Sequence, residues 1–253
     1  MKTVFLNKIF KPKGQFDLVR LGKKNDSGYL VDKRDVLTSD ILISFGVCHA
    51  WSFEEDFLKL KKVPIEAYDG TTGFFKLFKM AYVAFLTLQK QLFFQSIQAL
   101  LSYKKFFSGD VRHHALMVGF SQPPNFVSLQ EIINNVTNKN EKIFLKIDIE
   151  GWEYRLLDEI IKYSDKLSGL AIEFHEFDLH DKKVQDFIKK LPLEIAHVHC
   201  NNYGMVSPDL TPFVIEVTFS SHSPLNNKFL GLPHPLDSSN NKLIEDFKID
   251  FRK

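Results

Sequence analysis

Apolar and polar positions alternate along the chain in a pattern that predicts a sheet with helices on its faces. Short apolar runs rich in β-branched residues, each followed by glycine or a polar residue, predict buried strands. They occupy residues 41–47, 63–70, 113–120, 143–151, 167–178, 193–204 and 212–221. Amphipathic stretches that predict helices lie among them, over residues 51–62, 127–136, 152–163 and 181–191. This order favours a mostly parallel, seven-stranded α/β sheet, and the last two strands are close enough in sequence to form an antiparallel hairpin.

Three segments fall outside this alternation. Residues 20–31, RLGKKNDSGYLV, place a polar turn between two apolar pieces. Residues 74–107 are rich in aromatic side chains and free of glycine and proline, which predicts an insertion of one or two helices. The polar, proline-bearing tail over 224–253 is expected to cross the surface. No repeat or linker divides the chain, so we expect one domain over 1–253 with its core at about 18–220.

Composition narrows the function classes. The chain has 253 residues, of which 44% are apolar and 25% charged, enough to bury a full core. A net charge of +2 with mixed signs disfavours a nucleic-acid binder. Two cysteines, Cys48 and Cys200, suit a reducing compartment, so we expect a cytoplasmic protein. We expect no signal peptide and no integral membrane segment, because no apolar run reaches the required length.

The predicted strands end on polar side chains, at the edge where α/β sheets bind ligands. The first ends SFGVCHAW (44–51), the second YDGT (68–71), the fourth KIDIEG (146–151), the fifth IEFHEFD (172–178) and the sixth VHCNNYG (198–204). A single polar strand end would only reflect contact with water. Five together, with acids and histidines inside apolar strands, predict a polar site along this edge.

Two of these residues suggest a nucleotide-like ligand. Gly46 follows the first strand, where a glycine lets the backbone approach a ligand closely. Asp69 ends the second strand, where an acid can accept both hydroxyls of a ribose. A turn glycine and a solvated aspartate would look the same in a purely structural role. His49 and Trp51 stand where a dinucleotide site needs small residues, so NAD and FAD are disfavoured.

Six segments together resemble one enzyme family. They are NDSGYLV (25–31), SFGVCHAWSFEEDF (44–57), EAYDGT (66–71), LKIDIEGWEYRLL (145–157), IEFHEF (172–177) and HVHCNNYG (197–204). In order and spacing they resemble the FkbM-like methyltransferases, S-adenosylmethionine (SAM) dependent enzymes with the Rossmann-like class I methyltransferase fold. The most specific segment is LKIDIEG followed by an acid-bearing helix. The glycine-poor first loop departs from the family pattern.

The resemblance implies SAM as the cofactor and assigns residues to it. Those expected to contact SAM are Asn25, Asp26, Gly28, Tyr29, Phe45, Gly46, Val47, Asp69 and Asp148. Of these, Asp69 would hold the ribose and Asp148 would lie near the methyl group. The implied acceptor is a hydroxyl of a sugar or sugar nucleotide used in a bacterial surface polysaccharide such as a capsule. The residues themselves leave other small acceptors open, including a polyketide hydroxyl and a phosphorylated or phosphoramidate precursor.

Methyl transfer to a hydroxyl needs alignment of donor and acceptor and a group that takes the hydroxyl proton. Histidine titrates near neutrality, and the candidates at strand ends are His175 and His199. We prefer His199 because Asn201 and Asn202 follow it and could orient an acceptor hydroxyl. Structural histidines are common, so either ring could instead serve only packing.

Carboxylates at the same edge add further options. Asp148 is a third catalytic candidate, and Asp148, Glu173 and His175 could together hold a divalent metal ion, which we do not favour. Glu150 and Glu173 could instead contact the acceptor. Glu150 could also simply begin the helix after Gly151, where its charge suits the helix dipole.

The inserted segment 74–107 and the enzyme class both have alternatives. The segment could form a core helix pair, a lid over the acceptor or a dimer surface, and we expect a homodimer contact that also shapes the acceptor pocket. A non-catalytic nucleotide-binding protein on the same fold is one alternative function. A glycosyltransferase would need an acid pair for a metal-bound nucleotide diphosphate, which Asp178 and Asp181 match poorly.

Overall fold

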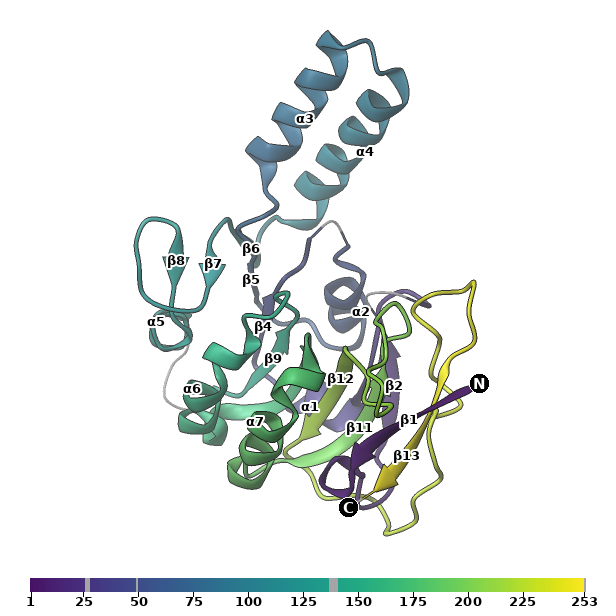
Figure 1. The fold of residues 1–253 in the computed structure, drawn as a ribbon. Helices are drawn as coiled ribbons and strands as arrows, with labels where there is room; N and C mark the ends of the chain where they lie inside the picture. Colours follow the sequence, from purple (N-terminus) through teal and green to yellow (C-terminus); the bar gives the residue numbers. More distant parts are fainter. Residues whose placement is uncertain (26–27, 49, 137–140, 253) are drawn as a thin grey trace.

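A seven-stranded sheet forms the centre of the molecule (Figure 1). A computed structural model describes residues 1–25, 28–48, 50–136 and 141–252. The strands of the sheet, in spatial order, are β11 (Glu194–Cys200), β12 (Ile215–Ser220), β10 (Leu167–Phe174), β9 (Ile143–Ile147), β4 (Ile41–Phe45), β5 (Ile65–Tyr68) and β6 (Val111–His114). The sheet is parallel except at β12, which runs antiparallel to both of its neighbours. The predicted fold is therefore confirmed, including the antiparallel pair β11–β12.

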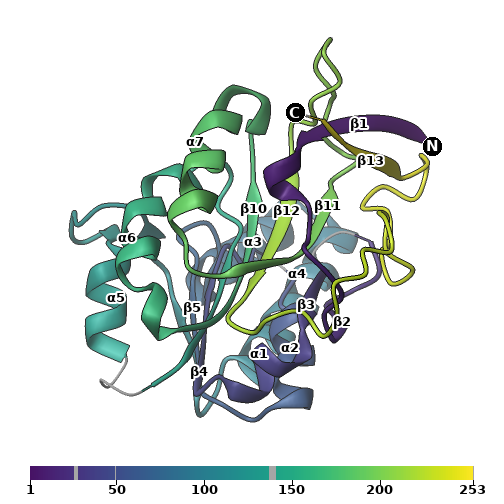
Figure 2. The ribbon, with the colours of Figure 1, turned by 90° about the horizontal axis from the view of Figure 1, so that it is seen from below.

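Helices cover both faces of this sheet (Figure 2). One face carries α5 (Leu129–Val136), α6 (Leu157–Lys162) and α7 (Phe177–Lys190). The other carries α1 (Lys33–Thr38), α2 (Ser52–Leu60) and a two-stranded hairpin of β2 (Leu18–Leu21) and β3 (Tyr29–Asp32). The short remaining elements on this part of the chain are β7 (Met117–Val118), β8 (Phe126–Val127), η2 (Glu153–Arg155) and η3 (Ser164–Lys166). Because both faces are covered, every residue of β4, β9 and β10 is buried.

The carboxyl ends of β4 and β9 approach each other closely. The Asp148 N–H donates to the Phe45 carbonyl at 3.1 Å, and the Gly46 N–H donates to the Tyr68 carbonyl at 3.0 Å. Gly46 has φ +75°, and a Cβ there would lie 1.5 Å from the Asp148 carbonyl oxygen. Only glycine fits this turn, for reasons of both conformation and space.

The inserted segment forms two helices, as predicted. They are α3 (Phe74–Leu86) and α4 (Lys90–Phe106), which pack against each other and project away from the sheet between β5 and β6 (Figure 1). At the base of this hairpin, Trp51 stacks on Phe106 with ring centroids 6.0 Å apart. Phe75, at the start of α3, and Phe94, in the first turns of α4, are 85% and 68% exposed. These two side chains do not pack the domain core, whereas Phe106 at the base of α4 packs against it, and the two helices bury Leu77, Ala81 and Leu100 against each other.

The two ends of the chain lie side by side. β1 (Lys2–Asn7), followed by η1 (Lys8–Phe10), pairs in parallel with β13 (Phe247–Arg252). The tail crosses the surface as predicted, but the strand that ends it was not predicted, because its partner lies at the opposite end of the sequence. Among the described residues, no helix combines the length and the apolarity needed to cross a bilayer.

Replacing Gly46 by alanine tests the close approach of β4 and β9. We expect Gly46→Ala to lower the free energy of unfolding by about 3 kcal/mol or more, because the new Cβ adds a collision to an unfavourable φ. The matched control is Gly109→Ala, which has φ +63° and no atom within 4 Å of the new Cβ, and which should cost only about 1 kcal/mol. Denaturant titration measures both. Equal losses would mean that the Gly46 turn relaxes freely.

Candidate active site

A cavity of about 300 Å³ lies beyond the carboxyl ends of β4, β5 and β9. Its lining comes from the turns after these strands and from the chain that follows β6. The residues are Gly46, Cys48, Tyr68, Asp69, Gly70, Thr71, Leu116, Met117, Val118, Asp148, Ile149, Glu150 and Trp152. This is the edge at which open parallel sheets bind ligands. Four residues that the sequence singled out, Gly46, Asp69, Asp148 and Glu150, meet here although they come from three distant segments of the chain.

Asp69 is held in this cavity by donors from two loops. Its Oδ2 accepts a hydrogen bond from the Cys48 N–H at 2.5 Å. Its Oδ1 accepts from the N–H and the hydroxyl of Thr71 at 2.6 and 2.5 Å and from the Thr72 N–H at 3.1 Å. Burial by itself would raise the pKa of Asp69, but these bonds hold it below its usual range. Asp69 is therefore an anion, and Oδ2, with one of the four bonds, retains capacity for a ligand hydroxyl.

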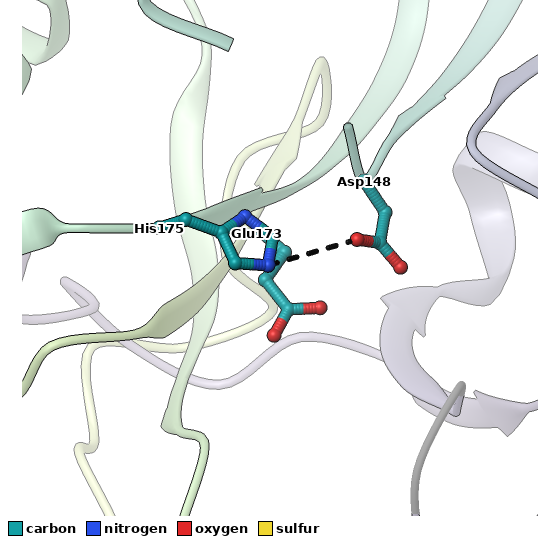
Figure 3. Close-up of side chains that lie close together, drawn as sticks. All are labelled: Asp148, Glu173 and His175. Atoms are coloured by element: carbon teal, nitrogen blue, oxygen red, sulfur yellow. Dashed lines mark ion pairs between the residues drawn. The ribbon is translucent and has the colours of Figure 1, made fainter. Parts of the chain in front are cut away.

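Asp148, Glu173 and His175 gather at the ends of β9 and β10 (Figure 3). One ligand atom from each lies within 4.8 Å of the others. The Tyr29 hydroxyl lies 3.1 Å from Asp148 Oδ2 and 2.9 Å from Glu173 Oε2, and the Asn201 amide donates to Glu173 Oε1 at 2.8 Å. Burial, reinforced by the charge of Asp148, raises the pKa of Glu173 well above its usual range. Two predicted contact residues, Tyr29 and Asn201, thus both contact a third, Glu173.

His175 is oriented by a buried carboxylate. Its Nδ1 lies 2.9 Å from Glu153 Oε1, which also accepts from the N–H groups of Ile149 and Gly151. Its Nε2 faces the acids at the cavity, 3.5 Å from Glu150 Oε2 and 4.0 Å from Asp148 Oδ1. Burial would lower the pKa of His175, but the hydrogen bond to Glu153 and the nearby carboxylates raise it to about 9. An acid that fixes one ring nitrogen and leaves the other toward a cavity suits both a general base and a metal ligand.

The same cluster fits a divalent metal ion. Two carboxylates and one imidazole are ligands that Mn²⁺, Fe²⁺ or Zn²⁺ accept. Because Glu153 occupies Nδ1, only Nε2 of His175 can serve the cavity, so His175 cannot bind a metal ion and take a proton at the same time. Tyr29 and Asn201 already donate to Glu173, which makes the cluster stable without an ion.

Lys146 is a buried cation of this site that was not singled out from the sequence. It is 2% exposed on β9, donates to the Gly46 carbonyl at 3.2 Å and lies 3.9 Å from Asp148 Oδ2. Its Nζ also lies 5.6 Å from the ring centroid of Tyr29. A lysine inside the apolar run IFLKI was the available signal, because a buried ammonium needs a charged or polar partner.

The sequence favoured His199 as the base, and the contacts of its ring do not support that preference. Its Nδ1 lies 3.3 Å from Glu216 Oε2 and its Nε2 lies 3.0 Å from Asp246. Burial alone would lower the pKa of His199, but these two carboxylates raise it well above its usual range. The ring is therefore a buried cation with both nitrogens occupied. Asn202 donates to the carbonyls of the chain around Asn241 and so also holds the C-terminal tail.

The other expected cofactor contacts that the structure describes are not among the lining residues of the cavity. The Asn25 amide donates to the Ser239 carbonyl at 2.8 Å, and Asp26 lies outside the described residues. Gly28 packs against the Lys23 carbonyl, where a Cβ would come within 2.2 Å. Phe45 and Val47 are buried next to Gly46.

The sequence pattern did not identify the apolar side chains that line one wall of the cavity. Leu116, Met117 and Val118 follow β6 and line the cavity, and Trp152 lines it from the turn before η2. The sequence run 113–120 predicts one continuous strand, whereas β6 ends at His114 and β7 covers only Met117–Val118. The hydrophobic pattern does not show where the chain changes direction within one apolar run, so it cannot show where one strand ends and the next begins.

No family model and no curated protein sequence matches the chain. Solved structures similar to it include precorrin-6y C5,15-methyltransferase from Geobacter metallireducens, an rRNA methylase from Streptococcus thermophilus and M. jannaschii TYW2 in complex with AdoMet. Their TM-scores are 0.39, 0.38 and 0.37, and their sequence identities are 12%, 11% and 10%. The matches cover 74%, 75% and 82% of this chain and 84%, 93% and 88% of the other chains. Similarity at this level transfers neither a substrate nor a site, so the function must be inferred from this chain's own residues.

Proposed function

We propose that this chain is a SAM-dependent O-methyltransferase that acts on a hydroxyl of a sugar or sugar nucleotide. The observation that carries the proposal is the cavity itself. It joins a glycine turn after β4, an anionic Asp69 after β5, and Asp148 and Glu150 after β9. His175 is not in the lining, but its Nε2 lies 4.0 Å from Asp148 Oδ1 and 3.5 Å from Glu150 Oε2. A nucleoside, a cationic centre and a hydroxyl acceptor would each meet a suitable group there.

The residues fit the parts of SAM in a consistent order. Asp69 Oδ2 suits a ribose hydroxyl, and the apolar wall at Leu116 and Val118 suits the flat face of an adenine. SAM, when bound, supplies an electrophilic methyl group on a positively charged sulfonium. The carboxylate of Asp148, 22% exposed and lining the cavity, favours a positive charge beside it. Gly46 contributes only backbone atoms to the lining of the cavity.

His175 is the group that would take the proton of the acceptor hydroxyl. Its Nε2 lies at the cavity side, and the Glu153 carboxylate stabilises the imidazolium that forms. With a pKa of about 9, most of the ring is protonated at neutral pH in the free protein. The reaction therefore needs the neutral minority of His175 at neutral pH, and that form increases as the pH rises toward 9.

The acceptor rests on the resemblance to the FkbM-like enzymes and on the polar rim of the cavity. Glu150, with φ +54° and a side chain 86% exposed, stands at that rim beside His175. A carboxylate so placed can accept hydrogen bonds from neighbouring hydroxyls of a sugar.

Asp69 provides the test of cofactor binding. Asp69→Ala should weaken SAM binding by on the order of 2 to 3 kcal/mol, because it removes a charged acceptor for ribose hydroxyls. Isothermal titration calorimetry with SAM measures the affinity. The control Asp186→Ala removes an exposed acid of α7 and should bind like the unchanged protein. An unchanged affinity in Asp69→Ala would show that the cofactor lies elsewhere.

The base is tested by His175→Asn, with His199→Asn as the matched variant. His175→Asn should lower turnover by roughly 10²- to 10⁴-fold while SAM still binds. His199→Asn should mainly lower the melting temperature, because it breaks a buried ion pair. In the unchanged enzyme kcat/KM should rise from neutral pH toward 9, and Glu153→Gln should move this rise to lower pH by lowering the pKa of His175. Normal turnover in His175→Asn would leave alignment alone as the mechanism.

A chelator decides between the two uses of His175. If His175 is the base, dialysis against EDTA should leave turnover of a sugar-nucleotide acceptor unchanged. Loss of activity that returns with Mn²⁺ or Mg²⁺ would assign Asp148, Glu173 and His175 to a metal ion instead. SAM binding without turnover on a panel of sugars and small hydroxylated metabolites would favour the non-catalytic alternative.

A further inference from the structure

The hairpin of α3 and α4 exposes more apolar surface than contact between its helices explains. Phe75, Phe78, Tyr82 and Phe85 are 85%, 56%, 56% and 61% exposed. Their spacing of three or four residues places them on one face of α3, and the hairpin projects from the domain (Figure 1). Leu88, in the turn between the helices, is 84% exposed. A continuous apolar surface of this kind marks an interaction site.

The charged side chains of the hairpin are all positive. Residues 74–109 contain five lysines, at positions 76, 79, 90, 104 and 105, and no aspartate or glutamate. Because the whole chain carries +2, the remainder of the chain carries −3. The positive charge is thus concentrated on the same segment as the exposed aromatic side chains.

We propose that this hairpin docks onto an anionic lipid surface, with the Phe75–Phe85 face and the Leu88 turn entering the headgroup region. Exposed aromatic and aliphatic side chains gain free energy by burial at the boundary between headgroups and acyl chains. Lysines next to them reach anionic headgroups with their ammonium groups while their carbon stems stay near apolar atoms. The absence of acids on 74–109 leaves nothing in the hairpin to oppose that attraction.

A second copy of the chain suits this surface less well. Two hairpins packed together would bring five lysines against five lysines with no acid to pair them. The hairpin also shows aromatic side chains on α3, as well as Phe94 and Leu101 on α4, which are 68% and 66% exposed. Apolar groups on both helices suit entry into a lipid layer better than one flat protein interface.

The docking geometry places the cavity close to the hairpin. Thr71 lines the cavity, and α3 begins at Phe74, only a short loop further along the chain. The Lys76 ammonium donates to the carbonyl of Gly70, another lining residue. The base of the hairpin is therefore fixed to the edge of the cavity, so docking would hold that edge near the lipid surface.

Vesicle flotation with the full chain tests the proposal. We expect binding to vesicles of phosphatidylcholine mixed with phosphatidylglycerol, little binding to phosphatidylcholine alone, and release as salt is raised. The double variants Phe85→Ser/Leu88→Ser and Lys79→Glu/Lys90→Glu should each weaken partitioning by about tenfold or more. The control Leu179→Ser/Leu243→Ser changes two residues that are 74% and 92% exposed elsewhere, and it should bind normally. Circular dichroism and melting temperature confirm that each variant is folded.

Three results would overturn the proposal. They are no partitioning to anionic vesicles at low salt, equal loss in the control variant, or a hairpin-dependent dimer in analytical ultracentrifugation that ignores vesicles. The last result would assign the surface to a contact between copies. Because flotation is measured without SAM or acceptor, its outcome is independent of methyl transfer.

Discussion

Two neighbouring acids at the ends of β9 and β10, Asp148 and the buried Glu173, are the constraint on which the site depends. Glu173 is 6% exposed and lies beside Asp148. Burying two acids whose ligand atoms lie within 4.8 Å of each other costs free energy unless hydrogen-bond donors or a cation surround them. Tyr29 and Asn201 supply the hydrogen bonds and Lys146 supplies a positive charge. These groups come from β3, the end of β11 and β9. Their contacts with the two acids therefore hold separate parts of the chain together at one edge of the sheet.

The requirement explains why the β2–β3 hairpin belongs to the site. Tyr29 begins β3, and its hydroxyl bridges Asp148 and Glu173 while its ring packs against Phe53 of α2. The pKa of Tyr29 is raised well above its usual range by burial and by these acids, so its hydroxyl stays a donor. A neutral hydroxyl has one proton and two lone pairs, so it can donate to one acid and accept from the other when that acid is protonated, without adding charge of its own. The β2–β3 hairpin is therefore attached to the site by the hydrogen bonds of Tyr29 as well as by the packing of its ring.

Histidine–acid pairs recur in the described part of the chain, and three of them, on β11 and after β10, have different consequences. His197 pairs with Asp237, and His199 lies between Glu216 and Asp246, which fastens the C-terminal tail to β11. His175 has the same kind of partner in Glu153, but its second nitrogen faces the cavity. The chemistry of the pairs is alike. Access of the second ring nitrogen to a ligand separates the one candidate base from the structural pairs.

The order of elements and the edge that carries the site could be predicted from the sequence. Apolar runs with polar ends identify β4, β5, β9, β10 and β11, because burial on both faces and exposure at the strand end leave different residue types. Gly46 and Asp69 could be found in the same way, because each directly follows an apolar run at the edge where the cavity lies. The helical insertion could also be predicted, because long apolar segments without glycine and proline favour a helix.

What each side chain does depended on partners distant in the sequence. His199 has a more suggestive sequence context than His175, yet Asp246 and Glu216 occupy both of its nitrogens. Glu153 orients His175 across a turn and a strand, and Lys146 is paired by the backbone of Gly46. The exposure of α3 follows from its projection away from the sheet, which its own pattern does not reveal. Sequence alone determined the fold class and the edge that carries the site, because these depend on local residue types. Tertiary structure decided the roles of individual groups, because hydrogen bonding and burial depend on which distant segments meet.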